Sequence, residues 1–249
     1  MTENHHASYP SLFVSHGAPT LALEDCAVTR FLTSLGQKLG KPKAILIISA
    51  HFDQRRPTIA CGERLETIYD FGGFPAALYE VRYPARGSSE IAVRVGELLL
   101  EAGIASDMDE TRGMDHGCWV PLVHMYPNAD VPIVQLSISM GQSPQWHFEL
   151  GQALSGLREE GVLIIGSGSA SHNLRELMMG QHDEEEPMVP WVLGVPLLKM
   201  VHEVKGYTPV RPMVFWLWIS MPLATKRKFP LPLKAREFLC VGYKSGSEQ

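Results

Sequence analysis

Four histidines lie at turns rich in glycine or serine, and three of these turns directly follow a short apolar run. They are His16 after residues 12–15, His51 after 45–50, His172 after 163–171, and His116 in the turn 114–117. Histidine is the commonest side-chain metal ligand and the usual acid or base near neutral pH. Ligands bind where the buried strands of a parallel sheet end. One such histidine alone is more often a hydrogen-bonded core residue, but four together indicate a metal-dependent active site.

The elements that would position these histidines alternate between strands and helices. We predict strands where short apolar runs occur and helices where apolar residues recur at helical spacing: strands at 12–15, 43–50, 57–61, 132–140 and 162–166, and helices at 28–39, 88–102 and 144–160. Residues 68–75 are rich in glycine and aromatic side chains and are expected to form a loop. This alternation predicts a single α/β domain whose central sheet is mainly parallel or mixed, with helices on both faces.

Composition argues against several classes of protein. The formal net charge of −5 gives no support for nucleic-acid binding, which usually shows a basic face. Four widely spaced cysteines without a Cys-x-x-Cys pair indicate neither a thiolate zinc motif nor a disulfide framework, so a reducing cytoplasmic setting is expected. No signal-peptide pattern is visible at the start, and the apolar stretch 213–223 is about half the length of a membrane span. We therefore expect a cytoplasmic protein with no nucleic-acid and no membrane partner.

The composition changes after about residue 178. Residues 1–198 carry a net charge of −11, whereas residues 199–249 carry +6, are rich in proline and lack clear periodicity. A basic interaction tail fits this reversal, and so does a segment from an altered reading frame or an alternative exon. We expect a disordered N-terminus at 1–11, a folded domain at 12–198 and an atypical basic tail at 199–249.

Eight short segments, taken in chain order, carry a resemblance to a known family. They are 15–19, 43–51, 70–75, 83–85, 115–122, 125–127, 135–137 and 166–174. Together they make residues 12 to about 177 similar to the class III extradiol ring-cleavage dioxygenases, the LigB-like family. Each segment alone is a weak signal, whereas the ordered combination is specific. The resemblance implies insertion of both atoms of dioxygen into a small catechol-type substrate such as a DOPA-like compound.

The resemblance also implies roles for the four histidines. His16 and His51 match metal ligands for one divalent ion, Fe(II) or Zn(II), of which Fe(II) suits the chemistry because zinc is redox-inert. His172 matches a histidine treated as a ligand near the metal or as an acid or base. His116 matches a histidine beside substrate and dioxygen, which makes it a catalytic candidate.

By the same analogy Asp70, Phe71 and Phe74 line the substrate loop, although a turn with packed aromatic side chains fits them equally well. One family feature is missing, because relatives carry a further metal-binding histidine in a motif near the C-terminus. Neither His182 nor His202 stands in such a motif. We therefore expect this chain to have weak ring-cleaving activity or none.

Two other functions remain open from the sequence, and the oligomeric state is undetermined. A catalytically silent metal-binding or interaction protein of the same superfamily is favoured by the missing histidine. A zinc hydrolase fits the histidines but leaves the resemblances at 70–75 and 115–122 unexplained.

Overall fold

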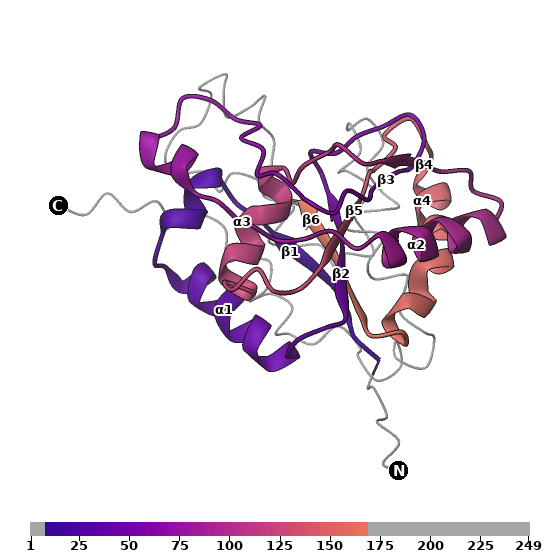
Figure 1. The fold of residues 1–249 in the computed structure, drawn as a ribbon, viewed down its shortest axis with the longest axis horizontal. Coiled ribbons are helices and arrows are strands. Elements are labelled where there is room, and N and C mark those ends of the chain that lie inside the picture. The colour runs from indigo at the N-terminus through magenta and orange to yellow at the C-terminus, as the bar shows by residue number, and fades with distance from the viewer. Residues whose placement is uncertain (1–7, 169–249) are drawn as a thin grey trace, which may run out of the picture.

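A six-stranded sheet forms the centre of the structure, a computed structural model that describes residues 8–168 (Figure 1). Its strands are β1 Ser11–Ser15, β2 Ala44–Ser49, β3 Thr58–Ala60, β4 Asp107–Asp109, β5 Ile133–Leu136 and β6 Val162–Gly168. They lie in the order β1-β6-β2-β5-β3-β4. Neighbouring strands are parallel except β3 and β5, which run antiparallel. The predicted α/β fold with a mainly parallel or mixed sheet is confirmed.

Strands β2 and β6 are buried along their whole length, which explains their continuous apolar sequence. In the parallel register Ser49 pairs with Ser167, and Ser15 pairs with Gly168. The carboxyl ends of β1, β2 and β6 therefore meet at one edge of the sheet. His16 follows β1 and His51 follows β2, so both reach this edge.

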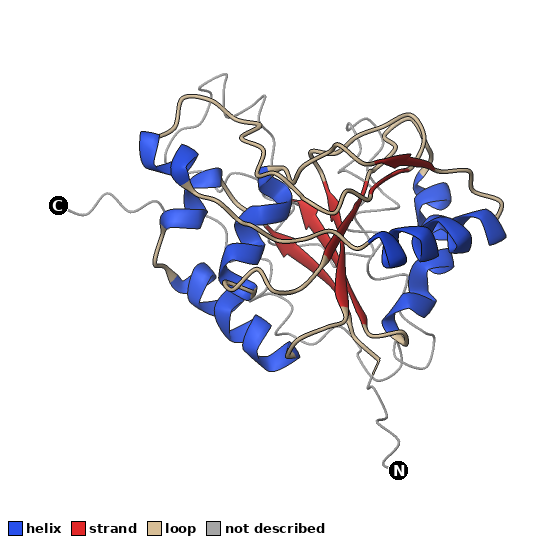
Figure 2. Ribbon diagram, in the orientation of Figure 1, coloured by secondary structure: helices blue, strands red, loops and turns tan. Residues whose placement is uncertain are grey.

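Helices cover both faces of the sheet (Figure 2). Helices α1 Ala27–Leu39 and α3 His116–Met125 lie on one face, and α2 Ser89–Glu101 and α4 Pro144–Leu154 lie on the other. Three short 3-10 helices complete the described part: η1 Pro19–Leu23, η2 Ala76–Glu80 and η3 Ser155–Arg158. Helices α1 and α3 pack closely at Gly36, where a Cβ atom would overlap the carbonyl of Met125.

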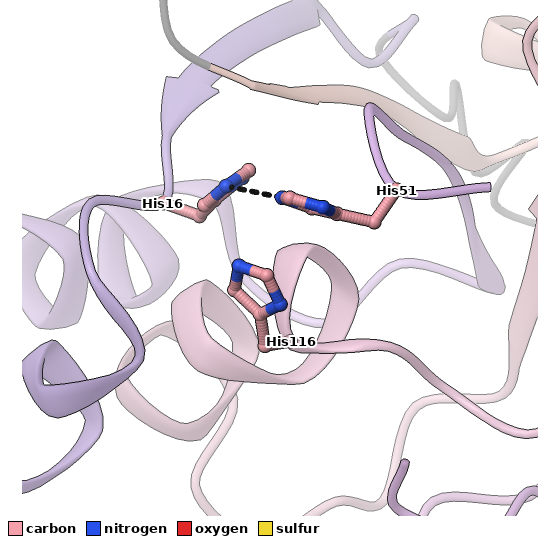
Figure 3. A group of neighbouring side chains, drawn as sticks. All are labelled: His16, His51 and His116. Carbon is pink, nitrogen blue, oxygen red and sulfur yellow. Dashed lines mark hydrogen bonds between the residues drawn. The ribbon is translucent and has the colours of Figure 1, made fainter. Parts of the chain in front are cut away.

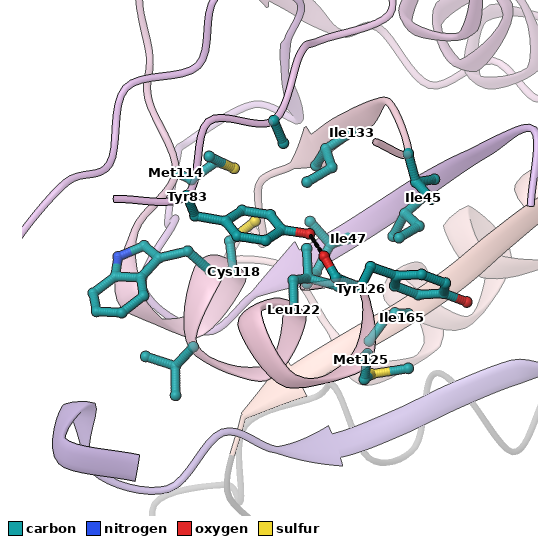
Figure 4. Close-up of a cluster of buried hydrophobic side chains, with 14 of the residues drawn as sticks. Ile45, Ile47, Tyr83, Met114, Cys118, Leu122, Met125, Tyr126, Ile133 and Ile165 are labelled. Carbon is teal, nitrogen blue, oxygen red and sulfur yellow. Dashed lines mark hydrogen bonds between the residues drawn. The ribbon is translucent and has the colours of Figure 1, made fainter. Parts of the chain in front are cut away.

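Two apolar cores, one on each face of the sheet, hold these layers together. Ile45 and Ile47 of β2 face the core that contains Leu122 of α3, whereas Leu46 faces the core shared with α2 and α4. Figure 4 shows the first core, where the buried Tyr83 hydroxyl donates a 2.8 Å hydrogen bond to the carbonyl oxygen of Tyr126. This packing fixes α3 against β2 and so positions the first turn of α3 at the sheet edge.

The structure differs from the sequence prediction at several elements. The turn predicted around His116 is the first turn of α3, because the Asp115 side chain accepts a hydrogen bond from the backbone N–H of Cys118 and caps the helix. The strand β4 was not predicted, since its sequence Asp-Met-Asp lacks an apolar run. Strand β5 is shorter than 132–140, and α4 ends at Leu154, where η3 continues the chain.

Parts of the predicted organisation lie outside the described residues, namely most of the N-terminal segment 1–11, residues 169–198 of the predicted domain and the whole tail 199–249. Among the helices of the described part, none is long and apolar enough to cross a membrane.

Candidate metal and catalytic site

Three histidine rings from three separate segments meet at the carboxyl edge of the sheet (Figure 3). His16, His51 and His116 each offer a ring nitrogen, and these nitrogens lie within 4.8 Å of one another. The Nε2 atoms of His16 and His51 are 3.1 Å apart. His16 and His116 are buried, whereas the His51 side chain is 31% exposed, so the cluster is reachable from solvent at His51.

His116 is held by the carboxylate of Asp70. Its backbone N–H donates to Asp70 Oδ1 and its Nδ1 lies 2.9 Å from Asp70 Oδ2. Burial by itself raises the pKa of Asp70, but the hydrogen bonds from the ring and backbone of His116 outweigh it, and the pKa lies below its usual value. The ionised carboxylate accepts a hydrogen bond from Nδ1–H, and the other ring nitrogen of His116 faces His16 and His51 (Figure 3).

The loop that carries Asp70 is tied to the segment before α3. The backbone N–H of Ile68 donates to the carbonyl of Met114, and Trp119 Nε1 donates to the carbonyl of Ile68. These two bonds place Asp70 beside the first turn of α3 although 46 residues separate it from His116.

His51 is positioned by a buried polar network at the end of β2. Its backbone N–H donates to Ser49 Oγ at 3.1 Å, and the Ser49 hydroxyl donates to Asp115 Oδ1 at 2.5 Å. Asp115 is fully buried and pairs through Oδ2 with Arg112 Nη2 at 3.0 Å. The guanidinium carbon of Arg112 lies 3.9 Å from the centre of the Phe52 ring. The turn after β2 is thus linked to the start of α3.

His16 is bound on its other side by Ser167 of β6. Its Nδ1 lies 3.0 Å from Ser167 Oγ, and the same hydroxyl contacts the carbonyl oxygen of Gly117 in α3. Each of the three histidines is therefore connected to the first turn of α3 or is part of it.

The donor set fits a single metal ion. Two imidazole nitrogens bound to one ion at about 2.0–2.1 Å lie about 3 Å apart when their bonds are near a right angle. The 3.1 Å separation of Nε2 in His16 and His51 matches this spacing. The ring nitrogen of His116, within 4.8 Å of both, is compatible with a third ligand or with a proton-transferring group beside the ion.

An aromatic cluster borders the histidines. The Phe71 ring meets the His116 ring edge-on with centroids 5.7 Å apart, and Phe74 packs edge-on against Phe71 at 5.3 Å. The rings of Tyr79 and Trp119 also contact Phe71. Phe71 and Phe74 are only half-buried, so they present an apolar surface next to the histidines.

The structure therefore brings together five of the described candidate residues, namely His16, His51, Asp70, Phe71 and His116, with Phe74 packed against Phe71. His172 lies outside the described residues. The sequence assigned no role to Ser49, Asp115 and Ser167, although all three stand in the segments that carry the resemblance. Two sequence signals could have identified them. Ser49 and Ser167 are polar residues within or at the end of buried apolar strands, and Asp115 stands at the start of a helix.

Sequence comparison relates the chain to ring-opening dioxygenases. Residues 10–209 match the family model described as the catalytic LigB subunit of aromatic ring-opening dioxygenase. The chain is 45% identical over 182 residues to 4,5-DOPA dioxygenase extradiol of Escherichia coli (strain K12), covering 73% of this chain and 66% of that protein. It is 49% identical over 166 residues to 4,5-DOPA dioxygenase extradiol of Beta vulgaris, covering 65% and 62%. The matched region thus spans less than two thirds of each relative.

Structure comparison agrees with this relationship. The crystal structure of an uncharacterized protein from Escherichia coli K12 superposes with a TM-score of 0.66 and 35% sequence identity. The match covers 85% of this chain and 88% of the other.

Proposed function

Because the chain belongs to the LigB family of aromatic ring-opening dioxygenases, we propose that it acts as an extradiol dioxygenase on catechol-type substrates, DOPA-like compounds among them. The observation that carries the proposal is the convergence of His16, His51 and His116 beside a half-buried aromatic surface. A catalytically silent member of the superfamily is not favoured, because the relatives at 42–49% identity are named as dioxygenases.

In this proposal His16 and His51 hold one divalent metal ion. When bound, Fe(II) would supply a Lewis acid for the two catechol oxygens and the redox chemistry that dioxygen requires, which zinc does not offer. His16 follows β1 and His51 follows β2, and both strands pair with the buried strand β6, so the sheet register sets the separation of the two ligands. A fixed ligand geometry orients the substrate ring and limits the loss of rate that poor alignment causes.

His116 is proposed as the acid or base that moves the phenolic proton. Asp70 holds its Nδ1, so the other ring nitrogen is directed at the space beside His16 and His51. A neutral imidazole in that position takes a proton from a catechol hydroxyl and returns it later in the reaction. His172 is proposed as a further ligand or proton carrier on the family resemblance alone.

Phe71 and Phe74 are proposed to contact the aromatic ring of the substrate. Phe71 already packs edge-on against His116, so a planar ring beside that imidazole would lie next to Phe71 as well. Offset or edge-on contacts between aromatic rings contribute about 0.5–1.5 kcal/mol beyond the burial of their surface. Asp70, also a substrate-loop candidate, has both carboxylate oxygens engaged by His116, so we propose that it acts on substrate through that histidine.

We also propose a cytoplasmic location. Cys26, Cys61 and Cys118 of the described part are free thiols, as expected in a reducing compartment.

The decisive experiment is oxygen consumption and ring-opened product formation with DOPA and simple catechols, after anaerobic loading with Fe(II). The unmodified chain is compared with a chimera that carries the C-terminal region of a typical family member. We expect the chimera to be active, and the unmodified chain to be much slower because its tail lacks the further histidine. Absence of ring opening by both proteins would refute the proposed function.

Two controls make the result specific. His51→Ala in the chimera is expected to abolish turnover, because it removes a proposed ligand without touching the core. Equal turnover by the chimera and the unmodified chain would show that the tail is no impediment, while leaving the dioxygenase assignment intact.

A further inference from the structure

We propose that Ser167 is a positioning residue that fixes the tautomer of His16 and ties this ring to the first turn of α3. Ser167 is fully buried in β6, and its hydroxyl lies between two partners, Nδ1 of His16 and the carbonyl oxygen of Gly117. Ser167 would thus be a further residue that supports the proposed metal site. Its effect on metal binding rests on the proposed ligand role of His16.

The direction of the two hydrogen bonds follows from counting protons. A serine hydroxyl has one proton to donate and two lone pairs that accept. The carbonyl of Gly117 can only accept, so the proton of Ser167 points to Gly117. Nδ1 of His16 must then donate to Ser167, and the proton of the neutral His16 ring is on Nδ1. The lone pair of this ring is consequently on Nε2, the atom that faces His51.

The sequence of α3 explains why the Gly117 carbonyl can take part. In an α-helix this carbonyl would accept the N–H of the residue four positions later, which here is Pro121. Proline has no N–H, so the helix itself supplies no such donor for Gly117. The Ser167 hydroxyl donates to the Gly117 carbonyl instead. Pro121 therefore leaves this carbonyl available to the residue that contacts His16.

The arrangement has a clear consequence for metal binding. A histidine ligand needs its lone pair on the nitrogen that faces the ion, and the partner of the other nitrogen sets which tautomer is present. Removal of such a partner lowers metal affinity or activity by about 10–100-fold in other proteins. Ser167 reaches His16 across 151 residues of sequence and couples it to the helix that carries His116.

Two readouts test the proposal on the full-length protein without an activity assay. Long-range proton–nitrogen NMR of the metal-free protein at pH 8 reports the tautomer of His16, whose signals are assigned with His16→Gln. Isothermal titration with zinc chloride reports metal affinity. Ser167→Ala is compared with Ser137→Ala, because Ser137 is another buried serine whose hydroxyl accepts from the backbone N–H of Thr58 and does not contact a histidine.

We expect His16 to carry its proton on Nδ1 in the wild type and to shift toward the Nε2–H form in Ser167→Ala. Zinc affinity should fall about 10–100-fold in Ser167→Ala and stay near the wild-type value in Ser137→Ala. Ser167→Thr, which keeps the hydroxyl, should restore the wild-type tautomer. An Nε2–H tautomer in the wild type would overturn the proposal even if the alanine variant does not fold.

Two further outcomes separate this proposal from the proposed function. A tautomer shift with equal zinc affinity in Ser167→Ala and Ser137→Ala would overturn the link between Ser167 and metal binding. If instead His16→Ala binds zinc as tightly as the wild type, the ligand role of His16 fails. In that case a tautomer shift in Ser167→Ala would still support Ser167 as the residue that orients the ring.

Discussion

The hydroxyl of Ser49 lies 2.5 Å from the carboxylate of Asp115, and this contact joins the end of β2 to the start of α3. Both side chains are fully buried, and Asp115 also pairs with Arg112. The same serine accepts the backbone N–H of His51, whereas Asp115 directly precedes His116. One buried hydrogen bond thus relates the positions of two histidines from different parts of the chain.

We predict strong coupling between Ser49 and Asp115. A hydrogen bond to a charged group contributes about 1.5–3 kcal/mol, so Ser49→Ala and Asp115→Asn should show a coupling energy of at least about 1 kcal/mol in a double-mutant cycle. The free energy of unfolding is measured by urea denaturation. Ser49→Ala combined with Asp130→Asn is the control, because Asp130 is on the surface and pairs with Lys41. Additive effects in the Ser49–Asp115 cycle would contradict the prediction.

A second prediction concerns Gly117, which allows the close approach of the turn after β2. A Cβ atom at this position would overlap the Ser49 hydroxyl and lie 3.1 Å from Cδ2 of His51. Gly117→Ala should therefore destabilise the protein by about 1–3 kcal/mol, as overpacking does, and weaken zinc binding. Gly96→Ala in α2 is the matched control, since its Cβ meets only ordinary contacts with Ile59 and Ser106. The control should be neutral or stabilising by helix propensity; similar stability changes at both glycines would show that Gly117 is not constrained.

The third prediction separates the two roles open to His116. We expect His116→Ala to reduce turnover far more than metal content, because we propose that this ring, held by Asp70 at Nδ1, moves a proton and that His16 and His51 bind the metal. Turnover is measured in the active chimera, and metal content is measured by elemental analysis after Fe(II) loading. His124→Ala is the control on the same helix, where His124 Nε2 bonds the carbonyl of Leu21. Equal loss of metal and turnover would instead identify His116 as a ligand.

A fourth prediction links stability to pH through His147, which is buried in α4. Its Nδ1 donates to the carbonyl of Ser143 at 2.9 Å, and its Nε2 accepts the backbone N–H of Ser139 at 3.4 Å. Only the bond from Ser139 requires the neutral ring, because Nε2 must keep its lone pair to accept it, whereas Nδ1 can donate to Ser143 in either protonation state. Burial lowers the pKa of His147, opposed by the Ser143 bond and by Asp53. The unfolded chain therefore binds this proton more readily than the folded protein does.

The difference in pKa between the folded and unfolded states sets how stability changes with pH. Stability from His147 is fully present above the unfolded pKa of about 6.5 and is lost as pH falls through the lower folded pKa. In His147→Gln, whose side-chain oxygen can still accept from Ser139, the free energy of unfolding should fall less steeply below pH 6.5. Urea titrations at several pH values between 4.5 and 8 measure this slope. An unchanged slope would mean that His147 does not contribute to acid sensitivity.

The sequence by itself determined most elements of the described fold, with β4 and the start of α3 as exceptions, and the location of most candidate residues along the chain. The buried strands β2 and β6 are recognisable as continuous apolar runs, and helix α2 Ser89–Glu101 falls within the predicted helix 88–102. These signals are local, because they record burial and periodicity over neighbouring residues. His16 and His51 each follow a predicted strand. Because these strands run parallel in the sheet, both histidines lie at the same edge.

Only the tertiary structure decided which groups support those histidines. The order β1-β6-β2 brings Ser167 to His16, and the loop before η2 brings Asp70 to His116. Such contacts join residues 46 and 151 positions apart, and no local pattern of hydrophobicity specifies them. At Ser167, the hydroxyl lies between His16 Nδ1 and the carbonyl of Gly117, so the direction of its hydrogen bonds depends on all three groups together. The sequence places His16 and His51 at the ends of strands, and the packing of β6 and α3 determines which groups contact each ring.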